Sequence, residues 1–349
     1  MSSPVLHVKD CFFFEVPRAW YQPHYESASD VPSYILRDYL HLPEDAEVTA
    51  ESVKSIDQAD LEHISEAMAG KILIPQPFAR LQNLYEVKWG LGISKYMIIE
   101  LLVAVIVFAA FYWLKKAFFR SDVPRGRVRN MLEALVAFVR DQLARPALGK
   151  EDADTFVPFL LTAFMFILTA NLIGMLPFMG TITGDLHVTA GLALCTFVIG
   201  TYYGVQRMGW KGWISNFIPH IDLPPIFSPL KYMIFVIEVF GTLVKHVVLA
   251  IRLFANMMAG HMVLAGILGT VIIAAELLES GTSSWQWYLG APMAVIGSGI
   301  FSLLEFLVAF LQAYVFTLLS AMFISSSIHS HHPHAEHDHG HGHEHAHAH

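Results

Sequence analysis

The sequence predicts an all-α polytopic membrane protein with five membrane helices and one amphipathic helix on the membrane surface. Of the 349 residues, 54% are hydrophobic and only 15% are charged, whereas a soluble domain carries about 25% charged residues. The mean hydropathy is +0.48. Several long runs lack charged side chains, and they match or exceed the roughly 20 residues that a bilayer-spanning helix needs.

The first segment, residues 1–90, is expected to be an acidic extension outside the membrane. It holds most of the acidic excess behind the net charge of −8. A signal peptide is not indicated, because Asp10, Glu15 and Arg18 interrupt the apolar core that such a peptide requires. Aromatic side chains and an acidic, helix-like stretch at residues 43–68 indicate a small folded or surface-lying unit. Both a docking role and a solvated appendage are consistent with this composition.

The first membrane span is expected at residues 93–114. The basic residues that follow it closely are Lys115, Lys116, Arg120, Arg125, Arg127 and Arg129. By the positive-inside rule this end is cytoplasmic, which places the N-terminus outside and, after five spans, the C-terminus in the cytoplasm. Residues 129–143 alternate apolar and charged side chains at helical spacing, which predicts the surface helix. Nucleic-acid binding by the basic cluster is disfavoured because the cluster adjoins a span.

Four further membrane helices complete the predicted fold. Residues 156–184 carry no ionisable side chain, and a second run from Asp185 reaches residue 206, which together indicate a two-span hairpin. Two long helices are expected at residues 229–279 and 285–327. Cys195 lies in an apolar helix and is interpreted as a small core residue, and its distance from Cys11 implies no disulfide framework.

A polar stripe on the first long helix is the strongest functional signal. Glu238, Lys245 and Arg252 recur every seven residues, and Asn256 follows Arg252 by four, so the four share one helix face. A charged residue at membrane depth is costly and usually marks function. His261 is rotated from Arg252 by roughly 180° and displaced by about 13 Å, so the two address different surroundings.

These motifs resemble subunit a of the F-type ATP synthase. The core is RLFANMMAGH, residues 252–261, preceded by Lys245 and Glu238; NLIGMLP (171–177), SPLKYMIFVIE (228–238) and LQAYVFTLLSAMF (311–323) support it. The resemblance covers residues from about 90 to 328. Two positions depart from the family pattern. His246 replaces a usual proline and Ala255 a usual glycine.

The resemblance implies a proton-channel domain at residues 91–328, with the two long helices steeply tilted around a rotor. Arg252 would be the fixed charge facing a carboxylate of the c-ring. His261 and Glu305 would meet across the hairpin of the two long helices and exchange protons. The implied partners are the c-ring, the stator subunit b, the F1 sector and the lipid membrane. No cofactor is expected, and no P-loop or catalytic nucleophile motif is present, so nucleotide chemistry is expected on partner subunits. A bacterial inner membrane is favoured because a transit peptide is absent.

The remaining candidate residues each have a structural alternative. Asp185 and His187 resemble positions near the outer half-channel, and a local turn explains them equally well. Glu238, Lys245 and Asn256 either line the channel or form a satisfied polar stripe between helices. Gln312, seven residues after Glu305, either contacts the ion path or orients a helix contact. The sequence leaves H⁺ or Na⁺ coupling open, and His261 favours H⁺.

The tail at residues 329–349 is almost entirely His, Ala, Gly, Asp, Glu and Pro and is predicted to be disordered. Histidine-rich tracts bind metal ions loosely, but no fixed ligand spacing is present, so no specific metal site is expected. The tail motivates an alternative function, a divalent-metal transporter with a cytoplasmic buffer. A central arginine repels cations and disfavours this alternative.

Overall fold

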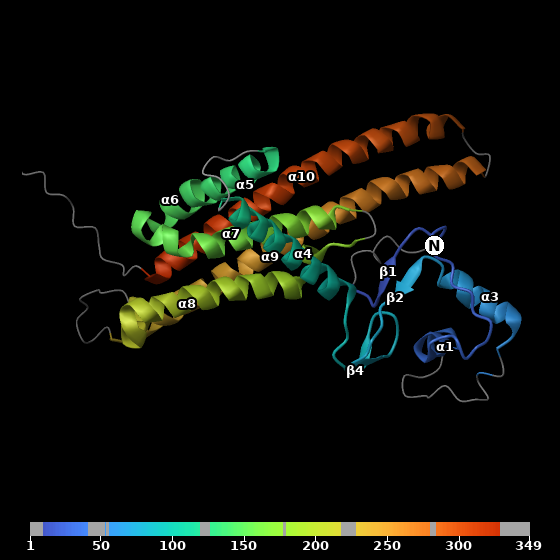
Figure 1. Ribbon diagram of the computed structural model, residues 1–349, viewed down its shortest axis with the longest axis horizontal. Coiled ribbons are helices and arrows are strands. Elements are labelled where there is room, and N and C mark those ends of the chain that lie inside the picture. Colours follow the sequence, from blue (N-terminus) through green and yellow to red (C-terminus); the bar gives the residue numbers. More distant parts are fainter. Residues whose placement is uncertain are drawn as a thin grey trace, which may run out of the picture.

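The computed structural model describes residues 10–40, 53, 56–118, 126–176, 179–217, 228–279 and 284–328. Long helices form a bundle, and a smaller unit that contains the N-terminal part of the described chain lies at one end of it (Figure 1). The tail at residues 329–349 lies outside the described residues, so its predicted disorder stays a prediction.

Five described helices are long and apolar enough to cross a membrane, which confirms the predicted fold class. They are α4 (Lys95–Phe118), α7 (Lys150–Gly174), α8 (Leu186–Asn216), α9 (Ser228–Glu279) and α10 (Ser284–Ile328). The bounds of α9 and α10 differ by at most one residue from those predicted. In α8, Gly209 has φ +70°, a left-handed conformation that glycine adopts without a Cβ clash, and the helix turns there.

The amphipathic segment is longer than predicted. It comprises α5 (Arg127–Phe138), a wider π-helical turn η2 (Val139–Ala144) and α6 (Arg145–Leu148). One face is buried in the bundle core through Val139, Leu143 and Leu148. The opposite face carries an ion pair of 2.7 Å between Asp141 and Arg145. The segment therefore packs one side on the bundle and exposes the other, as an amphipathic pattern requires.

The main core joins α7, α8, α9 and α10 with the amphipathic segment. Fully buried side chains include Leu160 and Phe164 of α7, Leu253 of α9 and Phe316 of α10. Cys195 was predicted to be a core residue, and this prediction is wrong: its side chain is exposed on α8. The apolar character of α8 does not reveal which face packs inward, because in a membrane both the lipid-facing and the protein-facing sides are apolar.

The N-terminal extension is folded around its own core, formed by α1 (Ser33–Tyr39) and α3 (Gln58–Ala67). It also contains two antiparallel strand pairs that the sequence did not predict: β1 (Phe13–Glu15) with β2 (Lys71–Leu73), and β3 (Ala79–Leu81) with β4 (Val87–Gly90). Lys95 N–H, at the start of α4, donates to Cys11 O at 2.9 Å. The extension is thus attached directly to the first membrane helix.

Candidate functional site

The two faces of α9 differ in burial. Glu238, Lys245, Arg252 and Asn256 are all exposed, while Leu249, Leu253 and Met257 of the same helix are buried. The polar stripe therefore lies on a face that the described helices leave uncovered. Among the described residues no ion pair to Arg252 is present, and the stripe is not sandwiched between helices of this part of the chain.

His261 and Glu305 meet on the opposite side of α9. His261 Nε2 lies 3.9 Å from Glu305 Oε1, and the Glu305 side chain is only 4% exposed. Their contact was expected from the resemblance to the family and is observed. Gly260 makes it possible, because a Cβ at that position would stand 2.8 Å from Glu305 Oε1. Neither carboxylate oxygen of Glu305 has a hydrogen-bond partner in the described structure. This titratable carboxyl group is therefore buried, and its oxygens accept no hydrogen bond.

A threonine that the sequence did not single out also contacts His261. The hydroxyl Oγ1 of Thr181 is hydrogen-bonded to His261 Nε2, and Thr181 is 2% exposed. Thr181 immediately precedes the short helix η3 (Ile182–Gly184). Because a hydroxyl both donates and accepts, it partners either protonation state of the imidazole nitrogen. The local sequence gives no signal for this contact, which joins residues 80 positions apart.

A second set of hydrogen bonds holds η3 in place. Thr183 Oγ1 donates to Asn171 Oδ1 at 2.7 Å, and Asn171 Nδ2 donates to the carbonyl of Ala309 at 3.2 Å. Asn171 is 1% exposed and belongs to α7, while Ala309 belongs to α10. These bonds link α7, η3 and α10 around the His261 and Glu305 pair, and they satisfy polar groups that would otherwise be buried at a cost.

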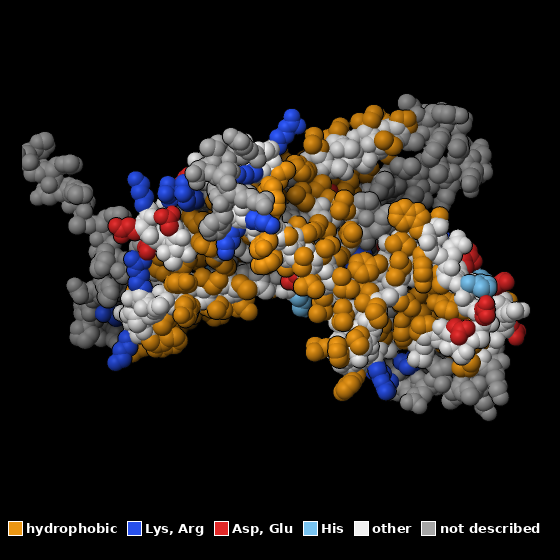
Figure 2. Space-filling model, viewed as in Figure 1, with side chains coloured by type: hydrophobic (Ala, Val, Ile, Leu, Met, Phe, Trp, Pro, Cys, Tyr) orange, Lys and Arg blue, Asp and Glu red, His pale blue; other side chains and the backbone are white. Residues whose placement is uncertain are grey.

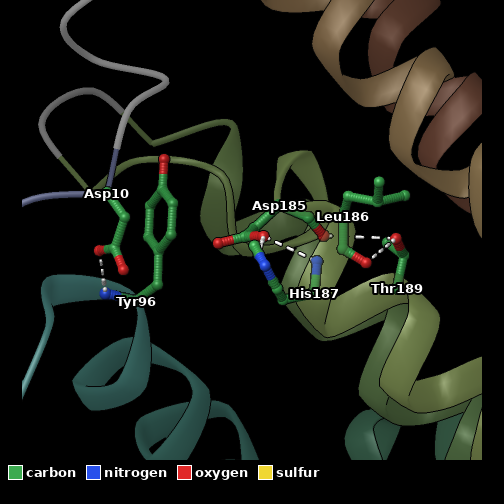
Figure 3. Close-up of polar contacts among 6 residues, drawn as sticks. All are labelled: Asp10, Tyr96, Asp185, Leu186, His187 and Thr189. Atoms are coloured by element: carbon green, nitrogen blue, oxygen red, sulfur yellow. Dashed lines mark hydrogen bonds and ion pairs between the residues drawn. The ribbon is translucent and has the colours of Figure 1, made fainter. Parts of the chain in front are cut away.

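Asp185 and His187 lie together just beyond η3 (Figure 3). Asp185 is the N-cap of α8, and its Oδ1 accepts from the His187 backbone N–H at 2.8 Å and contacts His187 Nδ1 at 2.9 Å. The local-turn interpretation is thus observed for this pair, although the His187 side chain is 97% exposed and accessible to solvent. Tyr96 and Asp10 lie on the other side of Asp185 (Figure 3).

Asp10 brings a carboxylate of the extension to this end of the bundle. Its Oδ1 accepts from the backbone N–H of Cys11 at 2.9 Å and of Tyr96 at 3.3 Å. Burial raises the pKa of Asp10, hydrogen bonds from Ser94, Tyr96 and Cys11 oppose the rise, and the Asp185 carboxylate adds to it. The extension therefore contributes a titratable group beside Asp185.

Gln312 and His246 are both buried. Gln312 is 7% exposed and lies on α10 two turns after Glu305, on nearly the same helix face. His246 Nδ1 contacts the carbonyl of Thr242 at 2.9 Å, and its ring packs against Phe197 and Phe323. The helix α9 continues through His246, so the departure from the usual proline leaves the helix unbroken.

The described part of the chain contains no group of three or more His, Cys, Asp or Glu side chains placed to hold a metal ion. The histidine-rich tract at residues 329–349 lies outside it. The site consists instead of an exposed face of α9 with Arg252, and a pair formed by the half-buried His261 of α9 and the buried Glu305 of α10. The Thr181 and Thr183 hydroxyls and the Asn171 amide lie around this pair.

Five membrane-competent helices with ionisable residues at membrane depth define an integral membrane protein. The comparisons give its family. The family model described as ATP synthase A chain matches residues 97–325, and the chain therefore belongs to the ATP synthase A chain family. Similar proteins named "ATP synthase subunit a" occur in Anaeromyxobacter dehalogenans, strain 2CP-1 (42% identity over 61% of this chain and 52% of the relative), and Myxococcus xanthus (41% identity over 69% and 75%). The matched region spans about half of the Anaeromyxobacter protein.

Proposed function

We propose that this chain is subunit a of an F-type ATP synthase, the stationary proton-conducting part of its membrane sector. The family match over residues 97–325 and the relatives named "ATP synthase subunit a" support this assignment. The observation that carries the mechanism is the division of α9 into an exposed face with Arg252 and a buried side where His261 meets Glu305. The family match favours this function over the divalent-metal transporter that the histidine-rich tail suggested.

Arg252 is the fixed positive charge of the proposed mechanism. Arginine stays protonated in any protein setting, so Arg252 does not itself relay protons. Its exposed position on α9 leaves it available to a carboxylate on a passing subunit of the c-ring. The attraction stabilises the ionised carboxylate and releases its proton. The same charge separates two aqueous half-channels, so that protons cross the membrane only on the rotor.

His261 and Glu305 are the proposed proton-exchange pair. Histidine is the side chain whose ordinary pKa is closest to neutral pH, and its Nε2 lies 3.9 Å from Glu305 Oε1. The Thr181 hydroxyl is hydrogen-bonded to the same nitrogen. We propose that the polar path continues from the pair through Asp185, His187 and Gln312. Each proton that crosses down its gradient releases about 2.3 kcal/mol of free energy per 100 mV of membrane potential. Several protons are therefore needed for each ATP made.

The proposed setting follows from this role. The channel domain comprises residues 91–328, the acidic extension 1–90 lies outside a bacterial inner membrane, and the tail 329–349 lies in the cytoplasm. Subunit b, the c-ring and the F1 sector are the proposed partners, and ATP chemistry occurs on F1. The long helices α9 and α10 are proposed to be steeply tilted against the c-ring, which places Glu238, Lys245 and Asn256 along the same interface as Arg252.

ATP-driven acidification of inverted vesicles tests this function. In Arg252→Gln the complex is expected to assemble and hydrolyse ATP but to pump no protons, because the fixed charge is lost. Lys245→Gln is the matched control, since Lys245 lies seven residues earlier on the same exposed face, and it is expected to keep most of the pumping. Pumping by Arg252→Gln at the unaltered rate would contradict the proposal.

A further inference from the structure

The β3–β4 hairpin of the extension exposes three large apolar side chains. Phe78, Trp89 and Leu91 are 71%, 76% and 82% exposed. They lie within a short stretch of chain that ends at the first membrane helix. Single exposed apolar residues are ordinary on a protein surface, whereas several on one small element mark an interaction site.

Hydrogen bonds join the two chain segments that flank the β3–β4 hairpin. Gln76, which precedes β3, makes two hydrogen bonds with Ile93 of the linker between β4 and α4: Nε2 donates to Ile93 O at 2.7 Å, and Oε1 accepts from Ile93 N–H at 2.8 Å. Gly90 closes the strand pair at φ +98°, where a Cβ would stand 2.2 Å from the carbonyl of Phe78. Only glycine permits this close approach. The exposed side chains are therefore presented in a fixed orientation, at low entropic cost for binding.

The exposed apolar surface of the hairpin continues into the lipid-facing surface of α4. Met97 and Leu101, in the first turns of α4, are 53% and 66% exposed. Figure 2 shows hydrophobic side chains over α4 and over the region of β4, with a basic side chain at the edge of that region. Leu91 precedes Lys95 by four residues, and a linker of this length spans at most about 14 Å. The hairpin thus lies within reach of the polar headgroup layer that borders a hydrocarbon core of about 30 Å.

The chemistry of the hairpin fits a lipid surface. Arg80 is the cross-strand partner of Trp89 and is exposed, so a basic and an aromatic side chain lie side by side. Tryptophan prefers the interface between hydrocarbon and water, where its ring is buried and its N–H keeps a partner. Basic side chains next to it attract lipid phosphate groups.

We propose that the β3–β4 hairpin is a membrane-interface anchor, which inserts Phe78, Trp89 and Leu91 into the lipid leaflet around the N-terminal end of α4. The anchor fixes the extension against the membrane beside the site formed by Asp10, Asp185 and His187. It requires only that α4 spans the membrane, so it stands or falls separately from the proposed proton-channel function.

Spin-label accessibility in the assembled complex tests the anchor. The exposed Cys195 is replaced by serine, a nitroxide is attached at Trp89→Cys, and the complex is reconstituted into phosphatidylcholine vesicles. Oxygen partitions into lipid and a neutral nickel chelate into water, so collision rates with the two report the surroundings of the label. Glu62→Cys is the matched control, because Glu62 is exposed on α3 in the same folded extension. The Cys195→Ser chain with Cys11 retained measures background labelling.

At position 89 we expect oxygen collisions to exceed nickel-chelate collisions, and at position 62 the reverse. Equal water accessibility at both positions would overturn the proposal. Protection of position 89 from both reagents would also overturn it, because it would show that another protein covers the hairpin. A label at Phe78→Cys repeats the measurement with Trp89 intact, so a displacement caused by losing Trp89 cannot decide the result.

Discussion

The two faces of α9 differ in their burial and in the polar groups that surround them. The face with Arg252 also carries Lys245, Glu238 and Asn256 and is exposed throughout. The other side places His261 in a packed environment with Thr181 and Glu305. Lipid provides no partner for an exposed charge at membrane depth, and the proposed function supplies one for the first face as a c-ring carboxylate. The second face already has its partners within the chain.

Because their surroundings differ, the two groups of residues should respond differently to substitution. Changes on the exposed face are expected to affect coupling to the partner while leaving the internal packing intact. Changes on the buried side are expected to affect proton transfer itself, and their size should follow how directly each residue touches the His261 and Glu305 pair.

The largest effect is expected for Glu305→Gln. This substitution keeps the shape of the side chain but removes its titratable proton, and general acid and base groups contribute roughly 100-fold or more. ATP-driven proton pumping should fall by about that factor. Glu238→Gln on the exposed face is the matched control, and its proton pumping should fall far less. Equal losses in both variants would remove the distinction between the faces.

A smaller effect, about tenfold, is expected for Gly260→Ala, because a slight misplacement of a reacting group is costly. The added methyl group would approach Glu305 Oε1 to 2.8 Å and displace the carboxylate from His261. Gly241→Ala is the control on the same helix, since no heavy atom of the described structure lies within 4 Å of a Cβ there. Pumping rates per assembled complex measure the effect, and unaltered pumping by Gly260→Ala would show that the carboxylate position is not critical.

Thr181→Val should reduce the pumping rate about fivefold, because this factor corresponds to the free energy lost with one hydrogen bond. Thr181→Ser keeps the hydroxyl and should restore most of the rate, which a purely steric role would not predict. In a His261→Gln background the loss from Thr181→Val should vanish, because the two residues act through one contact. Additive losses in the double variant would instead place Thr181 outside the proton path.

The smallest effect concerns Asp10. Because burial raises its pKa in the folded state, the contact of the extension with α4 should be strongest below the ordinary aspartate pKa of about 3.9. The contact should weaken as pH rises through the raised value, since ionising the buried carboxyl then costs stability. Hydrogen exchange of the backbone amides at residues 94–97, corrected for intrinsic rates, should show protection falling as the pH rises through the raised pKa of Asp10. In Asp10→Asn this protection should not change with pH.

Much of this arrangement could be predicted from the sequence, and the helix period explains why. The ends of the two long helices α9 and α10 were predicted to within one residue, whereas the uncharged run at residues 156–184 did not predict that α7 begins at Lys150 and ends at Gly174. A rotation of 100° per residue placed Arg252 and His261 on different sides of α9. The contact of His261 with Glu305 followed from the resemblance to the family.

The features that the sequence did not predict depend on tertiary packing. Thr181 reaches His261 only because η3 is fastened by Asn171 to α10, and no local pattern shows a contact across 80 residues. The strands of the extension have three or four residues each. This is too short for an alternation of apolar and polar side chains to be recognised in the sequence. Cys195 was misplaced because an apolar helix in a membrane looks alike on its lipid-facing and its buried side.

Passive proton flow tests the central claim, that the two faces of α9 perform different tasks, most directly. Vesicles carrying the complex without its F1 sector are given an imposed membrane potential, and proton entry is compared for Arg252→Ala and Glu305→Gln. We expect Arg252→Ala to abolish ATP-driven pumping in the complete complex yet to conduct protons passively, because the barrier between the half-channels is lost. Glu305→Gln should lose both activities. Loss of passive conduction in Arg252→Ala, or normal conduction in Glu305→Gln, would contradict the account.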